Sequence, residues 1–290
     1  LSPSVLFYPL VCYISSMADL SLSSKIVLNN GVKMPVLGLG VYQVTNGEAR
    51  TVVKEALDIG YRHIDTAAYY HNERGVGQAI KESGVPRDDV FITTKLWHTD
   101  NGYREALAAC DRSLKALGVD HVDLYLIHWP RGDRQGAWKA MDRILDEGKA
   151  RSAGVSNFLP RHLDDIMSAS SLVPSVDQVE FSPFLYQKEL LSYCRDKGIA
   201  LEAYSPLTKG RRLNDPRLVA LAREYGRTPA QMLLRWVVQK GMAAIPKSVR
   251  PERMRENAAI FDFEISAKDE AEMDRFDEGY HTTWDPQDIP

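Results

Sequence analysis

The sequence predicts an α/β fold, because short apolar runs alternate with longer amphipathic runs along most of its 290 residues. Eight apolar runs are present, and most begin roughly thirty residues apart, which is the length of one strand–helix unit with its loops. No Gly-x-Gly-x-x-Gly or Walker loop follows any of them, although an open doubly wound sheet would carry such a loop at its switch point. A closed (β/α)8 barrel therefore fits the pattern better than an open sheet.

The chain opens with a predicted N-terminal β-hairpin, in which Asn30-Gly31 separates two apolar segments. The eight predicted barrel strands occupy residues 36–41, 61–65, 90–95, 122–128, 150–156, 176–180, 199–204 and 242–246.

Amphipathic patterns predict the helices that connect these strands. They occupy residues 47–59, 72–83, 101–117, 135–147, 160–169, 187–197 and 214–240, with a last pair at 251–258 and 266–276. Gly60, Gly84, Gly118, Gly148 and Gly198 stand where a helix should end. Residues 214–240 are long enough for two helices, so the prediction is a TIM barrel with extra helices after its seventh strand and at the C-terminus.

Composition excludes several classes of function. Hydrophobic residues make up 44% of the chain, charged residues 26%, and the net charge is −3. Without a Lys/Arg-rich block, we expect no nucleic-acid partner. Cys12, Cys110 and Cys194 lie far apart without metal-binding spacing, which predicts free thiols and a reducing, cytoplasmic compartment. We also expect a monomer with no membrane association.

The first residues stand apart from the predicted barrel. Residues 5–14 are apolar but too short to span a bilayer, and no basic segment of a secretory signal precedes them. Met17 suits a native start. Residues 1–16 are therefore interpreted as an upstream extension, and residues 17–290 as a single barrel domain.

Four polar residues mark one predicted site. Asp65, Lys95 and His128 each close one of three consecutive strands, and Tyr70 follows shortly after Asp65. Parallel barrel strands end on one face, where active sites form, so these side chains should meet. A phenol, an ammonium, an imidazole and a carboxylate in one place are the parts of a proton donor, which predicts an enzyme.

Each of these residues also has a structural explanation. Asp65 alone would more often cap the following helix, Lys95 alone would be a solvated loop lysine, and His128 alone a buried imidazole. Tyr69 is a competing phenol beside Tyr70. The joint occurrence on consecutive strands favours the catalytic interpretation.

The other strand ends are polar or aromatic as well. They carry Ser156, Asn157, Gln178, Tyr204, Ser205, Lys247 and Ser248. The amides of Asn157 and Gln178 match the donors and acceptors of a carboxamide. The Tyr204 ring offers a flat face for a heteroaromatic ring. This rim predicts a polar ligand.

Residues 245–257 predict an anion site on the same rim. Ser248 and Pro251 mark a helix start, where backbone N–H groups can receive an anion. Lys247 and Arg253 add positive charge, and the arginine fork suits a phosphate. A solvated basic turn is an equally common explanation of such a segment, but its place on the barrel rim favours a phosphate.

Three stretches closely resemble those of one enzyme family. They are Gly60-Tyr-Arg-His-Ile-Asp-Thr-Ala-Ala-Tyr-Tyr-His-Asn-Glu73, Gly154-Val-Ser-Asn-Phe158, and Ile245-Pro-Lys-Ser with Arg253, Glu256 and Asn257. Residues 38–40 and 123–130 agree with them. From Ser24 to its C-terminus, the chain resembles the aldo-keto reductases. The resemblance implies a (β/α)8 barrel that uses NADPH/NADP+ without a Rossmann domain to reduce a small-molecule carbonyl compound.

The resemblance also implies roles for individual residues. It maps the catalytic tetrad onto Asp65, Tyr70, Lys95 and His128. It places the cofactor against Gly40, Val41, Tyr42, Asp65, Ser156, Asn157, Gln178, Tyr204, Ser205, Leu207, Lys247, Ser248, Val249, Arg253, Glu256 and Asn257. It places the substrate against Tyr42, Tyr70, Trp97, His128 and Trp129, and no metal is expected.

These roles imply a mechanism for carbonyl reduction. Tyr70 is expected to donate the proton, and His128 to guide the carbonyl oxygen. A phenol has a pKa of ~10, and Lys95, held by Asp65, is expected to lower it by roughly one to three units.

Within the family, the chain is similar to the short-loop group of protozoan-type prostaglandin F synthases and bacterial diketogluconate reductases. The segment after Trp129 is short and few residues follow Tyr280, so we expect an open, permissive pocket. Tyr42 stands where many members have Trp, His71 where many have Gly, and Arg250 where Thr or Ser is frequent. The first two bear on the pocket shape, and the third should strengthen NADP binding.

Several functions stay open at this point. The chain could reduce the prostaglandin H2 endoperoxide to prostaglandin F2α, or act as a broad-specificity aldehyde, methylglyoxal or diketogluconate-type reductase. A regulatory subunit that binds NADPH without turnover is less consistent with the complete tetrad. An aldolase-type barrel with a Schiff base on Lys95 would leave residues 247–253 unexplained.

Overall fold

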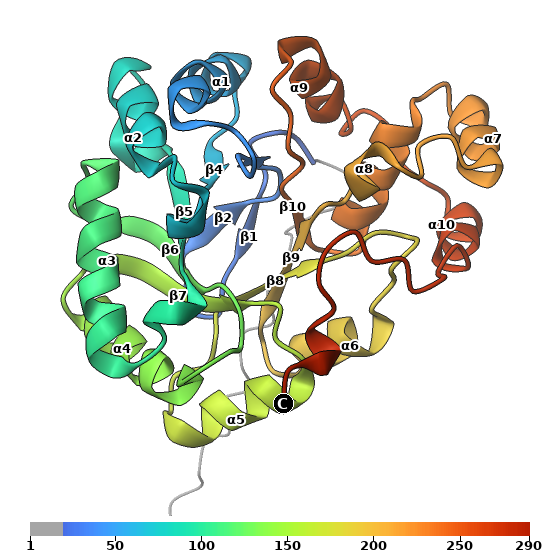
Figure 1. The fold of residues 1–290 in the computed structure, drawn as a ribbon. Helices are drawn as coiled ribbons and strands as arrows, with labels where there is room; N and C mark the ends of the chain where they lie inside the picture. The colour runs from blue at the N-terminus through green and yellow to red at the C-terminus, as the bar shows by residue number, and fades with distance from the viewer. Residues whose placement is uncertain (1–19) are drawn as a thin grey trace, which may run out of the picture.

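Eight parallel strands form the centre of the protein in the computed structural model, which describes residues 20–290 (Figure 1). Their order is β10-β9-β8-β7-β6-β5-β4-β3, so every strand pairs with its neighbour in sequence. Parallel bridges from Leu37 to Ala244 and from Gly40 to Lys247 join the two outer strands. These bridges close the barrel, and the predicted (β/α)8 fold is confirmed.

The strands agree with the predicted positions. They are β3 (Leu39–Gly40), β4 (His63–Asp65), β5 (Phe91–Leu96), β6 (Val122–Ile127), β7 (Ala150–Ser156), β8 (Val176–Glu180), β9 (Ala200–Tyr204) and β10 (Ala243–Ala244). The first and last are shorter than predicted, because isolated bridges replace a continuous ladder where the barrel closes.

Helices surround this barrel (Figure 1). They are α1 (Asn46–Ile59), α2 (Glu73–Glu82), α3 (Tyr103–Leu117), α4 (Arg134–Asp146), α5 (Pro160–Ala169), α6 (Lys188–Asp196), α7 (Pro216–Glu224), α8 (Pro229–Gln239), α9 (Pro251–Ala258) and α10 (Ala267–Asp274). The predicted run 214–240 is indeed two helices, because Thr228 and Pro229 begin a new one with a capping box. The extra helices after the seventh strand and at the C-terminus are confirmed.

The predicted hairpin is present and closes one end of the barrel. Strands β1 (Lys25–Val27) and β2 (Lys33–Pro35) pair antiparallel, with Ile26 opposite Met34. Gly31 in the turn has a φ of 84°, which side chains rarely adopt. The hairpin packs into an inner cluster of Ile26, Leu28, Met34, Val36, Phe91, Leu124, Leu126, Val176, Ala200 and Ala243. Four of these are first residues of strands, so the hairpin seals the N-terminal end.

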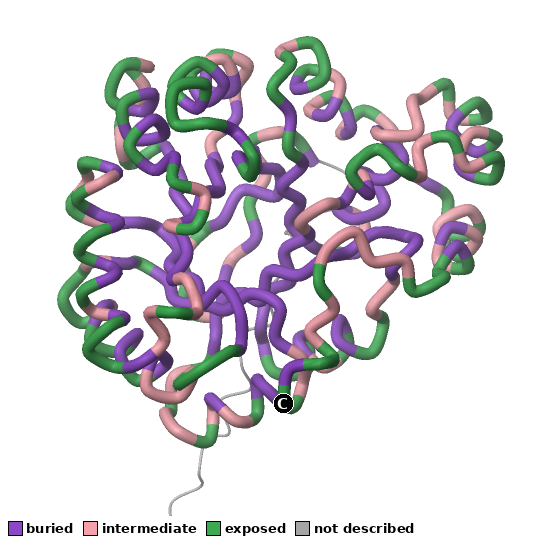
Figure 2. Tube along the Cα trace, viewed as in Figure 1, coloured by how far each residue is buried: buried purple, intermediate pink, exposed green. Residues whose placement is uncertain are grey.

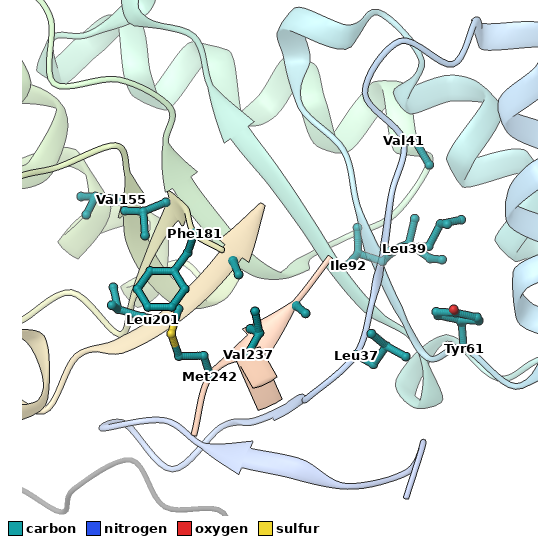
Figure 3. Packing of buried hydrophobic residues seen from close by; sticks show 14 of the residues in the cluster. Leu37, Leu39, Val41, Tyr61, Ile92, Val155, Phe181, Leu201, Val237 and Met242 are labelled. Atoms are coloured by element: carbon teal, nitrogen blue, oxygen red, sulfur yellow. The ribbon is translucent and has the colours of Figure 1, made fainter. Parts of the chain in front are cut away.

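A second core fills the space between the barrel and its helices. Figure 2 shows buried residues along the central strands and exposed residues on the outward faces of the helices. Ile92, Val155 and Leu201 point from their strands into this layer, and Val237 meets it from α8 (Figure 3). The outward positions of the strands pack in this layer, and the inward positions near the strand starts of β5, β8, β9 and β10 pack in the inner cluster, so the barrel wall is fixed from both sides.

Other sequence expectations concern single features. Cys110 and Cys194 are buried free thiols, as predicted. Among the described residues, no helix combines the length and apolar character that crossing a bilayer requires. The interpretation of residues 1–16 as an extension, and Cys12 within it, lies outside the described residues.

Close approach of two helices makes Gly77 a test of this packing. A Cβ at Gly77 on α2 would lie 1.8 Å from the carbonyl oxygen of Leu117 on α3. We expect Gly77→Ala to lower the free energy of unfolding by about 1–3 kcal/mol, because the helices must separate. Urea denaturation measures this change.

Gly47→Ala is the matched control on α1. Nothing lies within 4 Å of a Cβ at Gly47, so this change should be neutral or stabilise by about 0.5–1 kcal/mol through helix propensity. Equal stabilities of the two variants would contradict the packing described here.

Candidate active site

Strand alternation aims the predicted catalytic residues into the barrel. On β6, Leu124 and Leu126 belong to the inner cluster, whereas Tyr125 and Ile127 belong to the outer core. His128 is the next inward position. The same alternation turns Lys95 inward on β5 and Asp65 on β4.

Lys95 and Asp65 form a buried ion pair at the centre of the site. The Lys95 side chain is 0% exposed, and its Nζ lies 2.6 Å from Asp65 Oδ1. Nζ also donates to the carbonyl oxygen of Thr66 at 3.0 Å and to the hydroxyl of Tyr70 at 3.4 Å. Three acceptors satisfy the three protons of an ammonium.

Tyr70, rather than Tyr69, reaches this ion pair. Residues Ala68–Tyr70 form a short 3-10 helix after β4, which the sequence did not indicate. It turns the Tyr70 hydroxyl toward Lys95. The Tyr69 ring instead stacks on Trp97, with centroids 3.8 Å apart. The choice between the two phenols is therefore made by this turn.

The expected lowering of the pKa of Tyr70 is wrong in this structure. Burial raises the pKa of this hydroxyl well above its ordinary value, and the carboxylate of Asp65 raises it further. Asp65 lies closer to Lys95 than Tyr70 does, so it neutralises much of the field of the ammonium. Tyr70 is therefore held as a protonated phenol.

His128 is a neutral imidazole beside Tyr70. Burial lowers its pKa well below the ordinary value, and the positive charge of Lys95 lowers it further. The ring centroids of His128 and Tyr70 are 5.7 Å apart. Nδ1 of His128 has no hydrogen-bond partner within residues 20–290. A neutral imidazole can still donate one hydrogen bond to a ligand oxygen.

A cavity of about 1040 Å³ opens above these residues. It is as large as the upper end of typical small-molecule sites. All five predicted substrate residues line it: Tyr42, Tyr70, Trp97, His128 and Trp129. The predicted cofactor residues that line it are Gly40, Tyr42, Asp65, Ser156, Asn157, Gln178, Tyr204, Ser205, Leu207, Lys247, Ser248, Val249, Arg253, Glu256 and Asn257.

Val41 is the exception among the predicted contact residues. Its side chain is fully buried in the outer core and does not line the cavity (Figure 3). The reason is strand alternation, which turns Val41 outward. The Val41 side chain therefore does not reach the cavity, and a cofactor contact at this position would come from the backbone; the predicted contact stays a prediction.

The barrel rim holds Asn157 in an uncommon backbone conformation. Its φ is 65°, and its amide donates to the carbonyl oxygen of His128 at 3.0 Å. The Tyr204 hydroxyl donates to Asn157 Oδ1 at 2.7 Å. Gln43, Ser205 and Lys209 also combine positive φ with a place on the cavity wall. Such strain persists only where surrounding contacts hold it, and it concentrates at functional sites.

Three cations lie together on the wall at the start of α9. Lys247, Arg250 and Arg253 line the cavity, and their charged groups form no ion pair with any residue in the described part of the chain. Helix α9 begins at Pro251, so its N-terminal backbone dipole adds to this positive end. Glu256 also lines the cavity, and one of its carboxylate oxygens accepts from the Thr228 hydroxyl at 2.6 Å. The segment can receive an anion.

The C-terminal tail completes the wall, which sequence reasoning missed. Glu180 on β8 accepts from the backbone N–H of Thr282 at 2.8 Å and from the N–H and hydroxyl of Thr283 at 3.2 and 2.9 Å. The Thr282 hydroxyl donates to it as well. Trp284 follows, with its ring 5.7 Å from that of Trp129. A tryptophan in a polar tail was the only signal for this contact.

The tail also changes the picture of an open pocket. Thr282, Thr283 and Trp284 line the cavity, and Lys209 donates to the carbonyl oxygen of Thr282 at 2.8 Å. Farther on, His162 on α5 contacts the carbonyl oxygen of Ile289 at 2.9 Å. The short tail is therefore anchored at both ends and covers part of the site.

Comparison with known proteins identifies the family. The sequence profile described as "Aldo/keto reductase family" matches residues 36–278. The chain belongs to the aldo/keto reductase family.

Two relatives illustrate the range within this family. The chain is 49% identical to a glyoxal reductase of Bacillus subtilis, over 89% of this chain and 93% of that protein. It is 42% identical to a 9,11-endoperoxide prostaglandin H2 reductase of Trypanosoma cruzi, over 91% of this chain and 95% of that protein. Among solved structures, a Bombyx mori aldo-keto reductase in complex with NADP is similar, with a TM-score of 0.85 and 36% identity over 91% of this chain and 95% of that one.

Two departures from the family pattern have different consequences in this aldo/keto reductase. Tyr42 lines the cavity, and its ring lies 5.0 Å from that of Tyr70. His71 does not line it. Instead, His71 has a φ of 55°, a conformation that glycine adopts without strain. His71 therefore affects the backbone turn after Tyr70 and does not shape the pocket wall.

The tail contact can be tested at Glu180. We expect Glu180→Gln to speed amide hydrogen exchange at Thr282 and Thr283 by about tenfold or more, because one carbonyl oxygen cannot replace two charged acceptors. Exchange measured by mass spectrometry reports this. Glu278→Gln, at an exposed ion pair with Arg212, is the control and should leave exchange at Thr282 and Thr283 near wild type. Unchanged exchange in Glu180→Gln would contradict the anchor.

Proposed function

We propose that this protein reduces aldehydes and ketones to alcohols with NADPH, with Tyr70 as the proton donor. The observation that carries the proposal is the group of Asp65, Tyr70 and His128 on one wall of a large cavity, with Lys95 buried beside Asp65 and Tyr70. Family membership supports the reaction class, because aldo/keto reductases are oxidoreductases.

The chemistry of the cavity fits a phosphorylated dinucleotide. At one end, the unpaired cations Lys247, Arg250 and Arg253 suit a 2′-phosphate. At the other end, Ser156, Asn157 and Gln178 would hold the carboxamide of a nicotinamide, and the Tyr204 ring would face the heterocycle. When bound, NADPH supplies the hydride.

The protein's own residues supply the proton and orient the carbonyl. His128, neutral and beside Tyr70, would donate a hydrogen bond to the carbonyl oxygen and direct the carbon toward the nicotinamide side. As the carbon gains a hydride, negative charge grows on that oxygen, and the Tyr70 hydroxyl transfers its proton to it. The product is an alcohol. Lys95 stabilises the phenolate left on Tyr70, because its Nζ lies 3.4 Å away.

The geometry argues against the aldolase-type alternative. A Schiff base requires a lysine with a free lone pair. Here Lys95 donates to Asp65, Thr66 and Tyr70, and its side chain is 0% exposed. The ammonium form is thus held in place, and a carbonyl carbon has no path to Nζ.

The aromatic wall suggests the substrate class. Tyr69, Trp97, Trp129 and Trp284 line the cavity, which favours carbonyl compounds with an apolar or aromatic body. Among the specific candidates, small dicarbonyls such as glyoxal and methylglyoxal and sugar aldehydes lack such a body, whereas the prostaglandin H2 endoperoxide, a cyclic peroxide, has one. The relatives named above support the first and last. A kcat/KM panel over these compounds and p-nitrobenzaldehyde, with NADPH in excess, ranks them.

Buried Cys110 and Cys194 fit the proposed cytoplasmic location, and a monomer stays a prediction.

Tyr70→Phe tests the proton donor. We expect kcat with p-nitrobenzaldehyde to fall by at least about a hundredfold, because general acid catalysis is lost. The dissociation constant of NADPH should stay near that of wild type. Tyr69→Phe removes the same atom from the adjacent ring and should retain turnover. Turnover retained in Tyr70→Phe would refute the assignment.

Arg253→Ala tests the phosphate site. We expect the dissociation constant of NADPH to rise about tenfold and that of NADH to change little. Only NADPH carries the 2′-phosphate, so only its binding loses a charged hydrogen bond to Arg253. Arg255→Ala on the same helix, outside the cavity wall, is the control. An equal loss for both cofactors would remove the phosphate assignment.

A further inference from the structure

Gln178 reaches carboxyl groups on both sides of the barrel interior. Its Nε2 donates to Asp65 Oδ2 at 2.7 Å and to Glu202 Oε2 at 2.6 Å. A primary amide nitrogen carries two hydrogens, so both donors of Gln178 are engaged. Gln178 lines the cavity, and no donor within residues 20–290 bonds its side-chain carbonyl oxygen. The free face of this side chain is therefore an acceptor only.

Among residues 20–290, Gln178 is the only hydrogen-bond partner of the Glu202 side chain. It lies directly opposite Gln178 in the β8–β9 register and is 0% exposed. It is absent from the cavity wall, so it does not meet a ligand there. Its Oε1 has no hydrogen-bond partner in the described part of the chain and lies 3.6 Å from His63 Nε2. A buried carboxyl group with a single hydrogen bond is costly, which points to the hydrogen bond with Gln178 as its role.

The charge balance of the interior is consistent with this contact. Burial, together with the nearby Asp65 carboxylate, raises the pKa of Glu202 to about 8. Lys95 pairs with Asp65 at 2.6 Å, so one positive charge meets one negative charge. A neutral Glu202 still offers Oε2 as an acceptor for Gln178.

We propose that Glu202 is a positioning residue for the cofactor: together with Asp65, it holds both N–H groups of Gln178, so that only the carbonyl oxygen of Gln178 faces the nicotinamide carboxamide. This inference rests on the proposed function. The cofactor must then donate its amide N–H to Gln178. A cofactor whose ring carries an acetyl group in place of the carboxamide has no such donor.

The test compares two cofactors on the full-length protein. Dissociation constants are measured by quenching of protein fluorescence for NADP+ and for 3-acetylpyridine adenine dinucleotide phosphate, in which a methyl group replaces the amide NH2. We expect wild type to bind NADP+ about fivefold more tightly than the analogue, the effect of one hydrogen bond. The ratio of the two dissociation constants is the readout, because a general loss of structure weakens the binding of both cofactors to the same extent and leaves the ratio unchanged.

Three variants separate positioning from a structural role. Glu202→Leu removes the acceptor while keeping a buried side chain of similar size, so Gln178 can rotate and the ratio should fall toward one. Glu202→Gln keeps a carbonyl oxygen for Gln178 and should retain the wild-type ratio. Asp177→Asn is the matched control, because Asp177 is a buried acid on β8 whose Oδ1 faces the N–H of Phe158 instead.

The outcomes distinguish this inference from the proposed function. If wild type binds both cofactors with equal affinity, the orientation of Gln178 is wrong although NADP binding stands. A wild-type ratio in Glu202→Leu would also overturn the role of Glu202. Binding of neither cofactor by wild type would overturn the proposed function and this inference with it. If Glu202→Leu does not fold, Glu202→Met, which also lacks the acceptor, carries the same expectation.

Discussion

The buried ion pair of Lys95 and Asp65 is the interaction on which the centre of this protein depends. An ammonium without solvent is stable only where all its protons are accepted and its charge is matched. Asp65, the carbonyl oxygen of Thr66 and the hydroxyl of Tyr70 meet that demand. In doing so they fix Tyr70 beside His128. The second oxygen of Asp65 holds Gln178, so one pair organises both the proton donor and the neighbouring polar wall.

The barrel explains how such polar groups can stand inside a folded protein. Inward positions near the strand starts, such as Phe91 and Val176, are apolar and are sealed by the hairpin. One inward position later, Thr93 contacts His63, and Gln178 contacts Glu202. The last inward positions carry Lys95 and His128. The interior thus changes from apolar to charged along its axis, and the charged end is the one that the loops surround.

Loops and tail then turn this end into a ligand site. The start of α9 contributes unpaired positive charge, and the tail from Thr282 to Trp284 closes the opposite part of the wall through Glu180. Thr282 and Glu180 lie 102 residues apart in sequence, and the fold brings them together. Rigid strands therefore hold the reacting groups, while the surrounding segments define what fits against them.

The sequence by itself determined the alternation of strands and helices, and thereby which strand ends carry Asp65, Lys95 and His128. These features depend on periodicity and spacing, which neighbouring residues set. The family resemblance already assigned the phenol to Tyr70, and the tertiary structure shows the turn that brings Tyr70 and not Tyr69 to Lys95. Only the tertiary structure decided that Val41 turns outward and that the pKa of Tyr70 is raised. It also joined Gln178 to Asp65, 113 residues away, and Thr282 to Glu180, 102 residues away. The physical reason is that burial and charge at a point depend on every segment that the closed barrel brings there, and no local pattern contains that sum.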